Sequence, residues 1–599
     1  MFKTSIFKSS NKKEELLQRQ RYQGADSLPL KVSIRSAFHM IRIYWTSKES
    51  LWSWFLLSLI LILTGGSIYL ATAINRWYKD FWDTIQNYDL DGFKYHLMIF
   101  ALLATIHVFV SVYNAYLRSR LAIAWRRYFT GKVMHDWLSN NIYYKMQLKD
   151  RKTENPDQRI SEDLNSFVSY TINLILGTLT DLAMIGTFGL VLWDLSNSVT
   201  LTLWNDKTIT LPDGYMLYLA LAYAVCGTVL TFVLGKPLVR LNFRQQRYEA
   251  DFRFSLIRLR ENSESISLYQ GEKQEEVVLR KRFFEVVKNY MRLISCEKRL
   301  GFFTLGYAQL AVIFPILISA PMYFAKIITM GSIMQISSAF GRVQDSLSTV
   351  ISNFSSWASY KAVVDRLALY FDSMDENSNL ECLHPLKSGD GFEIKNVTVR
   401  NPLQKVLCKD LNLRLEKGQS LLIRGPSGCG KSTLIKTIAG LWPYATGQII
   451  EPSESTTLFL SQRPYLPQGT LREAACYPLT VFDQLEIEKY FKLLNLEHLI
   501  EHLDEENNWS MMLSLGEQQR VAFIRALIMR PDILILDEAS SALDEVLEAK
   551  AYDLILKELK EAILISVGHR SSLIKRHQFI LKASEDKQWI KCQSSKYSD

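Results

Sequence analysis

The sequence is poor in cysteine, and the cysteines that it has are scattered. The chain of 599 residues carries seven, an odd number, with no metal-ligand spacing between any two of them. This composition argues against a small secreted domain held by disulfides and favours a reducing compartment. The first long apolar block starts only near Leu51, so we expect no cleavable secretory signal at the N-terminus.

The chain also lacks a strong excess of one charge. Lys and Arg together number 70 against 61 Asp and Glu, a net charge of +9. Spread over this length, such an excess does not predict nucleic-acid binding, and we expect no nucleic-acid partner. Hydrophobic residues make up 48% of the chain and gather in long blocks within the first 360 positions. The length leaves room for several domains of roughly 150 residues each.

Six apolar blocks have the length of a helix that crosses a bilayer of roughly 30 Å. Trp and Tyr lie near several block ends, for example Trp52, Trp77 and Tyr116, as in an interfacial belt. A buried helix of a soluble protein is the alternative, but the first, second and fourth blocks carry almost no charge. The predicted spans are 51–75, 94–118, 168–194, 214–236, 301–327 and 331–357.

The loops between the spans predict their orientation. The loop 76–93 is acidic, whereas the long loops 119–167 and 237–300 are rich in Lys and Arg. By the positive-inside rule both basic loops are cytoplasmic, together with both termini and the region after the last span. We expect the two loops to be helices that continue out of the membrane.

The remaining segments complete the domain layout. Residues 1–50 predict a polar tail and a helix near 34–45, which lies either at the membrane surface or in a soluble part. Alternation of period two around Asn205 and Asp206 favours a small outward β-hairpin over a structureless loop. The layout is then a tail and elbow helix at 1–50, a membrane domain at 51–370, a linker at 371–390 rich in Asp, Asn and Ser, and a soluble domain at 391–599.

A glycine-rich loop between an apolar run and a helical pattern organises the soluble domain. It fits G-x-x-x-x-G-K-[ST], the P-loop that binds phosphates through backbone N–H groups and a helix N-terminus. Lys431 can reach the β- and γ-phosphates, and the Ser432 hydroxyl can bind Mg²⁺. We therefore predict ATP and Mg²⁺ as cofactors, with these nucleotide-binding residues: Gly425, Pro426, Ser427, Gly428, Cys429, Gly430, Lys431, Ser432 and Thr433.

Polar residues follow three further apolar runs. Asp537 and Glu538 end the run 533–536, where Asp537 can hold Mg²⁺ through water and Glu538 can polarise the attacking water. Gln462 follows a short run and is predicted to sense both Mg²⁺ and the membrane domain. His569 follows the run 562–566; a lone histidine is more often structural, but beside a P-loop we predict a contact with the γ-phosphate. The predicted catalytic residues are Glu538, His569 and Gln462, and the predicted metal ligands are Ser432, Gln462 and Asp537.

The stretch Leu513-Ser-Leu-Gly-Glu-Gln-Gln-Arg520 precedes a helical pattern, so its backbone amides can bind phosphate. This order of motifs resembles the ABC transporter nucleotide-binding domain over about the last two hundred residues. The resemblance implies Walker A at 425–432, a Q-loop at Gln462, Walker B at 537–538 and a switch histidine at His569. It further implies phosphate-binding or site-completing roles in the signature and D-loop for Ser514, Gly516, Glu517 and Asp544.

In that family the signature of one subunit completes the ATP site of the other. The chain carries one membrane domain and one ATPase domain, so the resemblance implies a homodimeric half-transporter of exporter-like (type IV) architecture with two hydrolytic sites. Two positions depart from the family pattern. Leu515 replaces the usual first glycine of the signature, and neither Arg400 nor Asn401 supplies the aromatic ring that stacks on adenine.

Two cytoplasmic stretches narrow the family. Residues 155–160 and 261–272 resemble the membrane domain that peroxisomal acyl-CoA (subfamily D) half-transporters share with a bacterial branch. That branch is linked to uptake of vitamin B12, bleomycin and antimicrobial peptides. The resemblance spans most of 30–370 and implies a multi-pass protein of the bacterial inner membrane, with the two stretches placed to transmit ATP-driven closure. Ordinary surface-loop chemistry is the alternative reading of these stretches.

The sixth predicted span is unusually polar. Polar residues at membrane depth usually face a bundle interior or a water-filled cavity, so we predict a hydrophilic or amphipathic cargo. Interhelical hydrogen bonds, with Arg342 paired to Asp345, are the alternative for some of them. Asp181 in the third span is more readily a structural partner than a proton-coupling group. The polar residues are Ser337, Ser338, Arg342, Gln344, Asp345, Ser346, Ser348, Ser352, Asn353, Ser355 and Ser356.

Three functions agree with these features. The first is a bacterial ATP-driven importer of bulky hydrophilic compounds or peptides. The second is an exporter of lipid or acyl-CoA, which predicts an apolar cavity that the polar sixth span does not suit. The third is a non-transporting ATPase that regulates a membrane partner. The residues specify neither cargo nor direction of transport.

Overall fold

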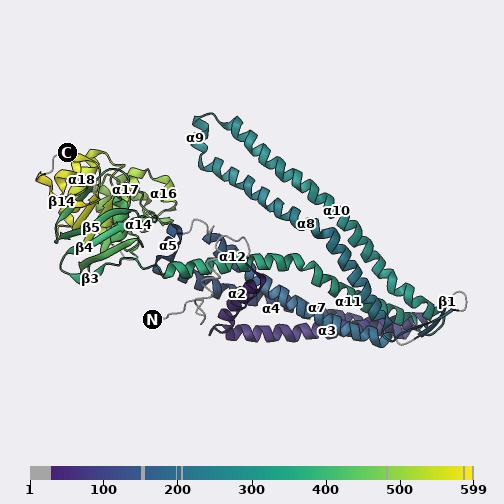
Figure 1. Cartoon of the computed structure of the whole chain (residues 1–599). Coiled ribbons are helices and arrows are strands. Elements are labelled where there is room, and N and C mark those ends of the chain that lie inside the picture. Colours follow the sequence, from purple (N-terminus) through teal and green to yellow (C-terminus); the bar gives the residue numbers. More distant parts are fainter. Residues whose placement is uncertain are drawn as a thin grey trace. The chain divides into compact units, whose positions relative to one another are not determined.

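The computed structural model describes residues 28–149, 155–196, 199–203, 207–479, 483–584 and 587–596. Two compact units make up the chain (Figure 1). The membrane unit comprises residues 1–136 and 154–372, and the ATPase unit comprises 137–153 and 373–599. Most of the predicted N-terminal tail, the predicted hairpin tip at Asn205 and Asp206 and the last three residues lie outside the described ranges.

The membrane unit consists of long helices. Pro156–Gln158 (α6) and a π-helical turn, Arg159–Asp163 (η2), precede its third long helix. The others are α2 Leu30–Trp45, α3 Ser50–Gln86, α4 Leu90–Leu138, α7 Leu164–Leu195, α8 Tyr215–Glu261, α9 Ser263–Leu268, α10 Glu272–Phe324, α11 Met330–Ser352 and α12 Phe354–Ser378.

Five stretches of described helix are long and apolar enough to cross a membrane, judged by length and composition. They are Ser50–Gln86, Leu90–Leu148, Pro156–Leu195, Tyr215–Glu261 and Glu272–Phe324. They contain the first three predicted spans and overlap most of the fourth and fifth. The sixth predicted span falls on α11 and the start of α12 and is not among the five. The count of six therefore stays a prediction.

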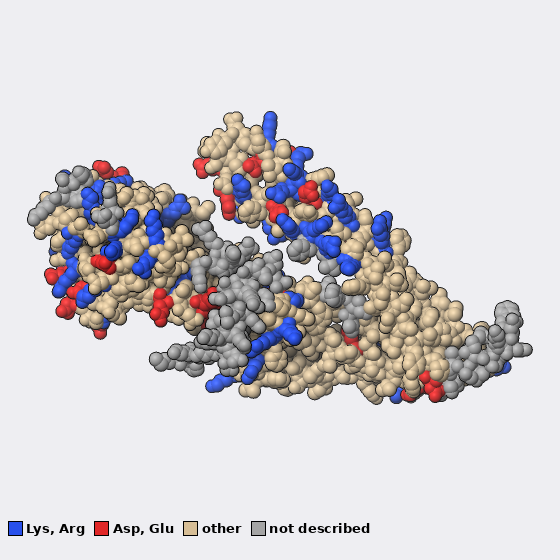
Figure 2. All heavy atoms as spheres, in the orientation of Figure 1, with Lys and Arg blue, Asp and Glu red and all other residues tan. Residues whose placement is uncertain are grey.

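The second basic loop is a helical extension of the spans, as predicted, whereas the first is so only in part, because α4 ends at Leu138 and the separate helix Ile142–Lys149 (α5) follows. Residues 237–300 form the far parts of α8 and α10, which run side by side to the tip helix α9 (Figure 1). The buried Asn289 of α10 joins them by donating to Leu241 O (3.0 Å) and Gln245 Oε1 (2.9 Å) of α8. Lys and Arg side chains, with some Asp and Glu among them, are spread over the face of both helices that Figure 2 shows.

The predicted N-terminal helix is present as α2 and is bonded to distant parts of the membrane unit. The Tyr44 ring stacks on Trp125 of α4 with ring centroids 5.2 Å apart. Asp365 of α12 is buried and accepts hydrogen bonds from Leu28 N (3.1 Å), from the Ser33 hydroxyl and from Lys361 Nζ (2.6 Å). These contacts join the start of the described chain to the helix that follows α11.

The predicted hairpin is confirmed. Strands β1 (Val199–Leu203) and β2 (Lys207–Leu211) pair antiparallel between α7 and α8, with Val199 opposite Leu211 and Leu203 opposite Lys207.

The structure differs from the predicted linker at 371–390. Helix α12 continues to Ser378, because Tyr370, Phe371 and Met374 are buried along it. The polar Asn377 is buried as well and donates from Nδ2 to Ser373 O (2.7 Å). Strand β3 (Leu386–Gly389) already belongs to the soluble domain, since it pairs in parallel with β7 (Ala445–Pro452). The Asp, Asn and Ser residues of this stretch thus lie largely on a helix.

Two sheets form the ATPase unit, which confirms the α/β class. The four-stranded sheet has the order β3-β7-β4-β5, with β4 Phe392–Arg400 and β5 Val406–Leu415. The six-stranded sheet has the order β14-β13-β6-β12-β11-β8, all parallel except β14. Its strands are β6 Ser420–Arg424, β8 Thr457–Leu460, β11 Ile533–Asp537, β12 Ile563–Val567, β13 Phe579–Ala583 and β14 Trp589–Gln593.

The central strands are buried on both faces, which explains their continuous apolar runs. In β11, Leu534 and Leu536 belong to one hydrophobic core, while Ile533 and Ile535 belong to the other. The short pair β9 Gly469–Thr470 and β10 Glu506–Asn507 lies apart from both sheets. The helices of this unit are α13 Lys431–Ile438, α14 Leu471–Cys476, α15 Gln484–Leu493, α16 Trp509–Met512, α17 Leu515–Met529 and α18 Glu545–Glu558.

A segment from the first basic loop also belongs to the ATPase unit. Helix α5 (Ile142–Lys149) has buried side chains at Ile142 and Met146, and the buried Lys145 donates from Nζ to Leu380 O (3.0 Å). Leu148 packs against the hydrophobic core of the sheets. The sequence did not predict this contact, because the loop's basic character and position between two spans placed it with the membrane domain.

Candidate functional site

The glycine-rich loop lies between β6 and α13, as predicted. Gly428 has φ +79° and Gly430 has φ +109°, in the left-handed region that favours glycine. A Cβ atom at Gly430 would also lie 3.1 Å from Leu407 Cβ. Gly430 is the N-cap of α13 and provides no side-chain cap, so the first amides of the helix are available to an anion.

Lys431 lies across this loop. Its side chain is buried, and Nζ donates to Gly425 O (2.9 Å) and Pro426 O (3.1 Å). Pro426, Ser427 and Gly428 are exposed, while Cys429, Gly430 and Thr433 are partly buried. The loop residues predicted to bind the nucleotide therefore lie together around the Lys431 ammonium group.

The predicted metal ligands Ser432 and Asp537 meet. Ser432 Oγ lies 3.4 Å from Asp537 Oδ1, at the end of β11. Burial raises the pKa of the Asp537 carboxyl above its ordinary value, and the hydrogen bond from Ser432 opposes that shift. Two oxygen ligands of this kind suit Mg²⁺, which takes its remaining ligands from water and nucleotide phosphates.

Glu538 and His569 meet at the same sheet edge. His569 Nε2 lies 3.4 Å from Glu538 Oε1. Their strands, β11 and β12, are parallel neighbours with Asp537 opposite Val567, so the residues after both strands reach one edge. Glu538 has φ +52°, an uncommon conformation for a residue other than glycine, and its N–H donates to Val567 O (3.2 Å).

Gln462 follows β8, which pairs with the other side of β11, so it lies at that edge as well. Its side chain is exposed, and its carbonyl oxygen accepts a hydrogen bond from Gln519 Nε2 (2.9 Å). Among the described residues no group of three or more His, Cys, Asp or Glu side chains could hold a metal ion. A magnesium ion at this edge would therefore depend on phosphate oxygens.

The predicted signature forms the N-terminus of α17. Ser514 and Glu517 make a capping box, with Ser514 N donating to Glu517 Oε2 (2.9 Å) and Glu517 N to Ser514 Oγ (3.4 Å). Burial alone would raise the pKa of Glu517, but its hydrogen bonds from Ser514 and His498 outweigh burial and lower that pKa. A Cβ atom at Gly516 would lie 3.2 Å from Ala542 O, so this glycine allows close approach of the two backbones.

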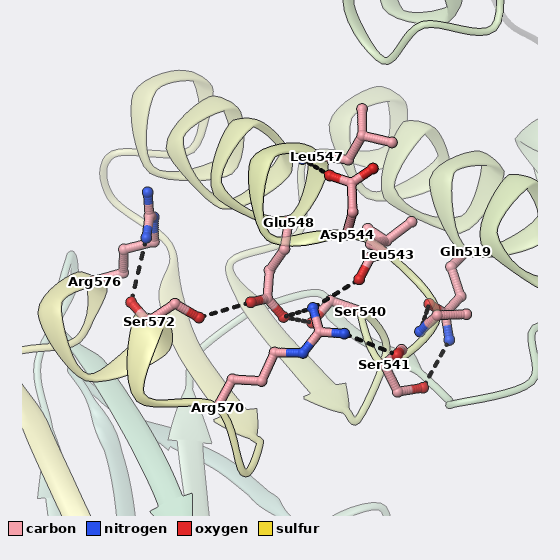
Figure 3. Close-up of polar contacts among 11 residues, drawn as sticks. Gln519, Ser540, Ser541, Leu543, Asp544, Leu547, Glu548, Arg570, Ser572 and Arg576 are labelled. Carbon is pink, nitrogen blue, oxygen red and sulfur yellow. Dashed lines mark hydrogen bonds and ion pairs between the residues drawn. The ribbon is translucent and has the colours of Figure 1, made fainter.

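The D-loop, residues 541–544, is bonded to α17, to α18 and to the segment after β12 (Figure 3). Asp544 caps α18 by accepting from Leu547 N (2.8 Å). Arg570 donates to Leu543 O (2.7 Å) and Ser541 O (3.2 Å), and the fully buried Gln519 contacts Ser541 and Ala542. Sequence reasoning missed Gln519 and Arg570. The only signal was their position directly beside motif residues.

The position expected to stack on adenine is a turn. Arg400 ends β4, where its N–H donates to Tyr444 O (2.9 Å) and its carbonyl accepts from Trp442 Nε1 (2.8 Å). Asn401 N donates to Lys405 O (2.9 Å) across the turn. Hydrogen bonds therefore hold the backbone of this turn, and neither position carries an aromatic side chain that could stack on adenine.

Comparison with known proteins identifies the family. Residues 40–324 match the family described as ABC transporter transmembrane region 2, and residues 408–541 match that described as ABC transporter. An uncharacterized ABC transporter ATP-binding protein of Haemophilus influenzae is 36% identical over 549 residues, which cover 91% of each chain. This chain belongs to the ABC transporter family. It is a multi-pass membrane protein whose ATPase domain binds and hydrolyses ATP to drive transport.

Other similar proteins cover almost the whole chain. The Escherichia coli inner membrane ABC transporter ATP-binding protein YddA is 29% identical, over 91% of this chain and 96% of its own. The human lysosomal cobalamin transporter ABCD4 is 28% identical, over 91% and 93%. A bacterial Atm1-family ABC exporter solved with ATP bound superposes with a TM-score of 0.69 at 16% identity, over 90% and 95%. This similarity confirms the exporter-like fold. The chain has one membrane domain and one ATPase domain, which is the content of a half-transporter and implies a dimer.

Proposed function

We propose that the protein is a homodimeric ABC transporter of the bacterial inner membrane that imports bulky hydrophilic compounds or peptides. The polar side of α11 carries this proposal. Arg342, Asp345 and Ser348 recur every third residue and are exposed, whereas Phe340 and Val343 of the same helix are buried in the membrane unit's core. Spacing of three keeps the polar residues on one side of the helix.

Charges at membrane depth are costly against lipid, so this side of α11 suits a water-filled path or a second copy of the chain. A hydrated path serves a hydrophilic cargo better than a lipid or an acyl chain. The similarity to a protein named as a cobalamin transporter agrees with a bulky hydrophilic cargo. The direction of transport rests on the resemblance to the bacterial uptake branch alone.

The geometry supports a division of roles within the ATP site. Lys431 and the amides of the P-loop would hold the phosphates, and Ser432, Asp537 and Gln462 would hold Mg²⁺. Glu538 would orient and activate the attacking water, with His569 beside it to contact the γ-phosphate. Ser514, Gly516 and Glu517 at the start of α17, together with Asp544, would complete the site of the second subunit. The amides at the helix start and the favourable end of its dipole suit a phosphate.

Exposed apolar side chains support a dimer formed through the membrane domain as well. The parts of α8 and α10 beyond the predicted spans leave Phe254, Phe283 and Phe284 exposed. Leu268, which ends α9, and the adjacent Tyr269 are exposed at the tip. Apolar surface of this extent on a protein outside the bilayer is usually covered by a partner. We infer that a second copy covers it.

Placement in the membrane follows from charge. The basic surface of α8 and α10 (Figure 2) suits the cytoplasmic side, which would put the ATPase unit and both termini in the cytosol. The similarity to the inner membrane protein YddA supports the inner membrane as the location. The docking of α5 in the ATPase unit, by Lys145 and Leu148, offers one route by which nucleotide-driven movement reaches the spans.

Uptake into sealed proteoliposomes tests this function. Purified protein receives ATP on the side of the ATPase domain, and fluorescent cobalamin or a labelled cationic peptide is offered from the other side. Accumulation that needs ATP and is lost in Glu538→Gln supports the proposal. Glu545→Gln, an equal change at an exposed carboxylate on α18, is the matched control.

Two outcomes would replace the proposal. ATP-dependent movement of acyl-CoA or lipid in the opposite direction would make the protein an exporter. Normal ATP hydrolysis without movement of any offered cargo, unaffected by Arg342→Gln together with Asp345→Asn, would favour a regulatory ATPase. Steady-state hydrolysis that persists in Glu538→Gln would instead overturn the assignment of the base.

A further inference from the structure

One buried amide joins three segments of the ATPase unit. Gln519 of α17 is fully buried, and its Nε2 donates to Gln462 O (2.9 Å) and to Ser541 Oγ (3.1 Å). Its Oε1 accepts from Ala542 N (2.9 Å). The signature helix, the Q-loop and the D-loop therefore meet at a single side chain, with both of its polar atoms used.

A guanidinium group holds the other side of the D-loop (Figure 3). Arg570 directly follows His569, and its two terminal nitrogens donate to Leu543 O (2.7 Å) and Ser541 O (3.2 Å). Because the planar guanidinium presents several N–H groups in a fixed geometry, it can bridge two carbonyl oxygens, which a lysine ammonium does less well. The segment that carries the switch histidine and the D-loop are thus bonded to each other.

The guanidinium is itself anchored by a buried carboxylate. Arg570 lies 3.5 Å from Glu548 Oε1, and Glu548 is almost completely buried in α18. Glu548 also accepts from Ser540 Oγ (2.7 Å) and Ser572 Oγ (2.9 Å). A buried charge with this many partners is costly to displace, so Arg570 has a fixed position from which to hold the loop.

We propose that Gln519 and Arg570 are positioning residues for ATP hydrolysis, which hold the D-loop between the Q-loop and the switch segment. In the part of the chain that the structure describes, neither side chain is hydrogen-bonded to the P-loop residues that would hold the phosphates. Gln519 bonds the Ser541 hydroxyl and Ala542 N, and Arg570 bonds the carbonyl oxygens of Ser541 and Leu543. Movement of Gln462 would reach Ser541 through Gln519, and movement of the D-loop would reach His569 through Arg570. This inference rests on the ATP site proposed above and adds the route by which cargo binding could alter hydrolysis.

Two substitutions separate the two connections. Gln519→Glu keeps the shape and can still accept from Ala542 N, but it loses the donation to Gln462 O. Arg570→Lys keeps a cation near Glu548 but loses the two-carbonyl bridge. Arg576→Lys is the matched control, since Arg576 donates to Ser572 O (3.2 Å) next to this network without contacting the D-loop.

The experiment measures ATP hydrolysis by the full-length protein in proteoliposomes, with and without cobalamin as the probe. We expect each variant to lower kcat about tenfold, as the loss of one or two buried hydrogen bonds would, while the KM for ATP changes less than about twofold. The kcat of the double variant should be no lower than about that of the more impaired single variant, because both residues act through one loop. The control variant should match the wild type.

Three results would overturn the inference. They are unchanged kcat in both variants, a rise in KM as large as the fall in kcat, or fully additive losses in the double variant. If the thermal unfolding midpoint of a variant drops far below that of Arg576→Lys, the variant is replaced by another substitution of the same residue, Arg570→His or Gln519→Asn. The same changes in kcat and KM are then required of the replacement. Failure of the proposed ATP site is distinguished by Glu538→Gln: if that variant hydrolyses ATP normally, the site itself is misassigned.

Discussion

The two units hold their buried carboxylates in different ways. In the ATPase unit, Glu548 is satisfied by two serine hydroxyls and one arginine, all within a few tens of residues along the chain. In the membrane unit, the buried Asp163 accepts from Arg159 NH1 (2.7 Å) and from two nitrogens of Arg366 (2.6 and 2.9 Å), a residue 203 positions away. The ATPase unit builds its polar site from neighbouring loops of one sheet, whereas the membrane unit relies on contacts between distant helices.

The helix ends differ as well. In the ATPase unit, side chains of Thr470, Asp483, Ser514 and Asp544 cap α14, α15, α17 and α18. In the membrane unit, α2, α3, α7 and α10 begin without a side-chain cap. A short helix depends on its ends more than a helix of many turns that is stabilised along its length by packing and by its apolar surroundings. The comparison predicts that the ATPase unit is sensitive to the loss of a single cap or loop contact, whereas the membrane unit loses most stability where a buried ion pair between distant helices is broken.

The largest expected effect is on activity. Lys431→Ala removes the cation that the P-loop surrounds, so ATP hydrolysis should fall by about a hundredfold or more while the fold is kept. Steady-state ATPase assays with matched thermal unfolding curves test this. Lys557→Ala, an exposed lysine on α18, should leave both measurements unchanged.

Next comes a loss of stability in the membrane unit. Asp163→Ala leaves Arg159 and Arg366 without their shared carboxylate, which should cost about 3–5 kcal/mol. We expect a lower thermal unfolding midpoint in detergent, with the exposed neighbour Asp157→Ala as control. Equal midpoints for the two variants would show that the ion pair between Asp163 and Arg366 does not stabilise the membrane unit, which would contradict the difference drawn between the two units.

A pH effect belongs to the ATPase unit. His577 is buried and bonded to Leu573 O (2.8 Å) and Ser566 Oγ (2.9 Å), and burial lowers its pKa to about 4. Because the unfolded chain binds this proton near pH 6.5, the unfolded state takes up more protons between pH 6.5 and 4, and stability falls as pH falls through that window.

The loss from this single group should approach about 3 kcal/mol at the acid end. Unfolding midpoints measured at pH 7 and pH 5 should differ less in His577→Gln than in the wild type. A pH dependence that the substitution leaves untouched would show that other groups cause it.

A helix cap should give a smaller effect. Thr470 and Glu473 form a capping box at α14, with Glu473 N donating to Thr470 Oγ1 (3.1 Å). Thr470→Ala should cost about 1 kcal/mol, measured as a shift in the unfolding midpoint of the ATPase unit's transition. Thr470→Ser, which keeps the cap, should restore the midpoint; if it does not, the loss comes from packing rather than from the cap.

The smallest effect is expected on the membrane unit's surface. Arg280 NH2 lies 2.7 Å from Glu276 Oε1 on α10, but both side chains are largely exposed. Arg280→Ala should change stability by less than about 0.5 kcal/mol. A larger change would indicate that this surface is covered in the dimer, which would sharpen the inference about the α8 and α10 surface.

Much of the ATPase unit could be predicted because its signals are local. The strand, glycine loop and helix around Lys431, and the acidic pair after β11, are specified by short runs whose backbone geometry follows from residue type. The meeting of Ser432 with Asp537, and of Glu538 with His569, follows from parallel strands that end at one edge. The hairpin at 199–211 and the helical extension of the second basic loop also follow from local sequence patterns.

The sequence by itself thus determined the elements, the family and the membrane-spanning lengths, since each depends on residues within a few turns of one another. Tertiary structure alone decided that α5 joins the ATPase unit, that Asp163 pairs with Arg366, that the polar stretch after 371 is helical, and that Gln519 meets both Gln462 and the D-loop. These contacts bring together residues far apart in the chain. Their partners are chosen by packing and by the need to satisfy buried polar groups, and no periodicity in the sequence records that choice.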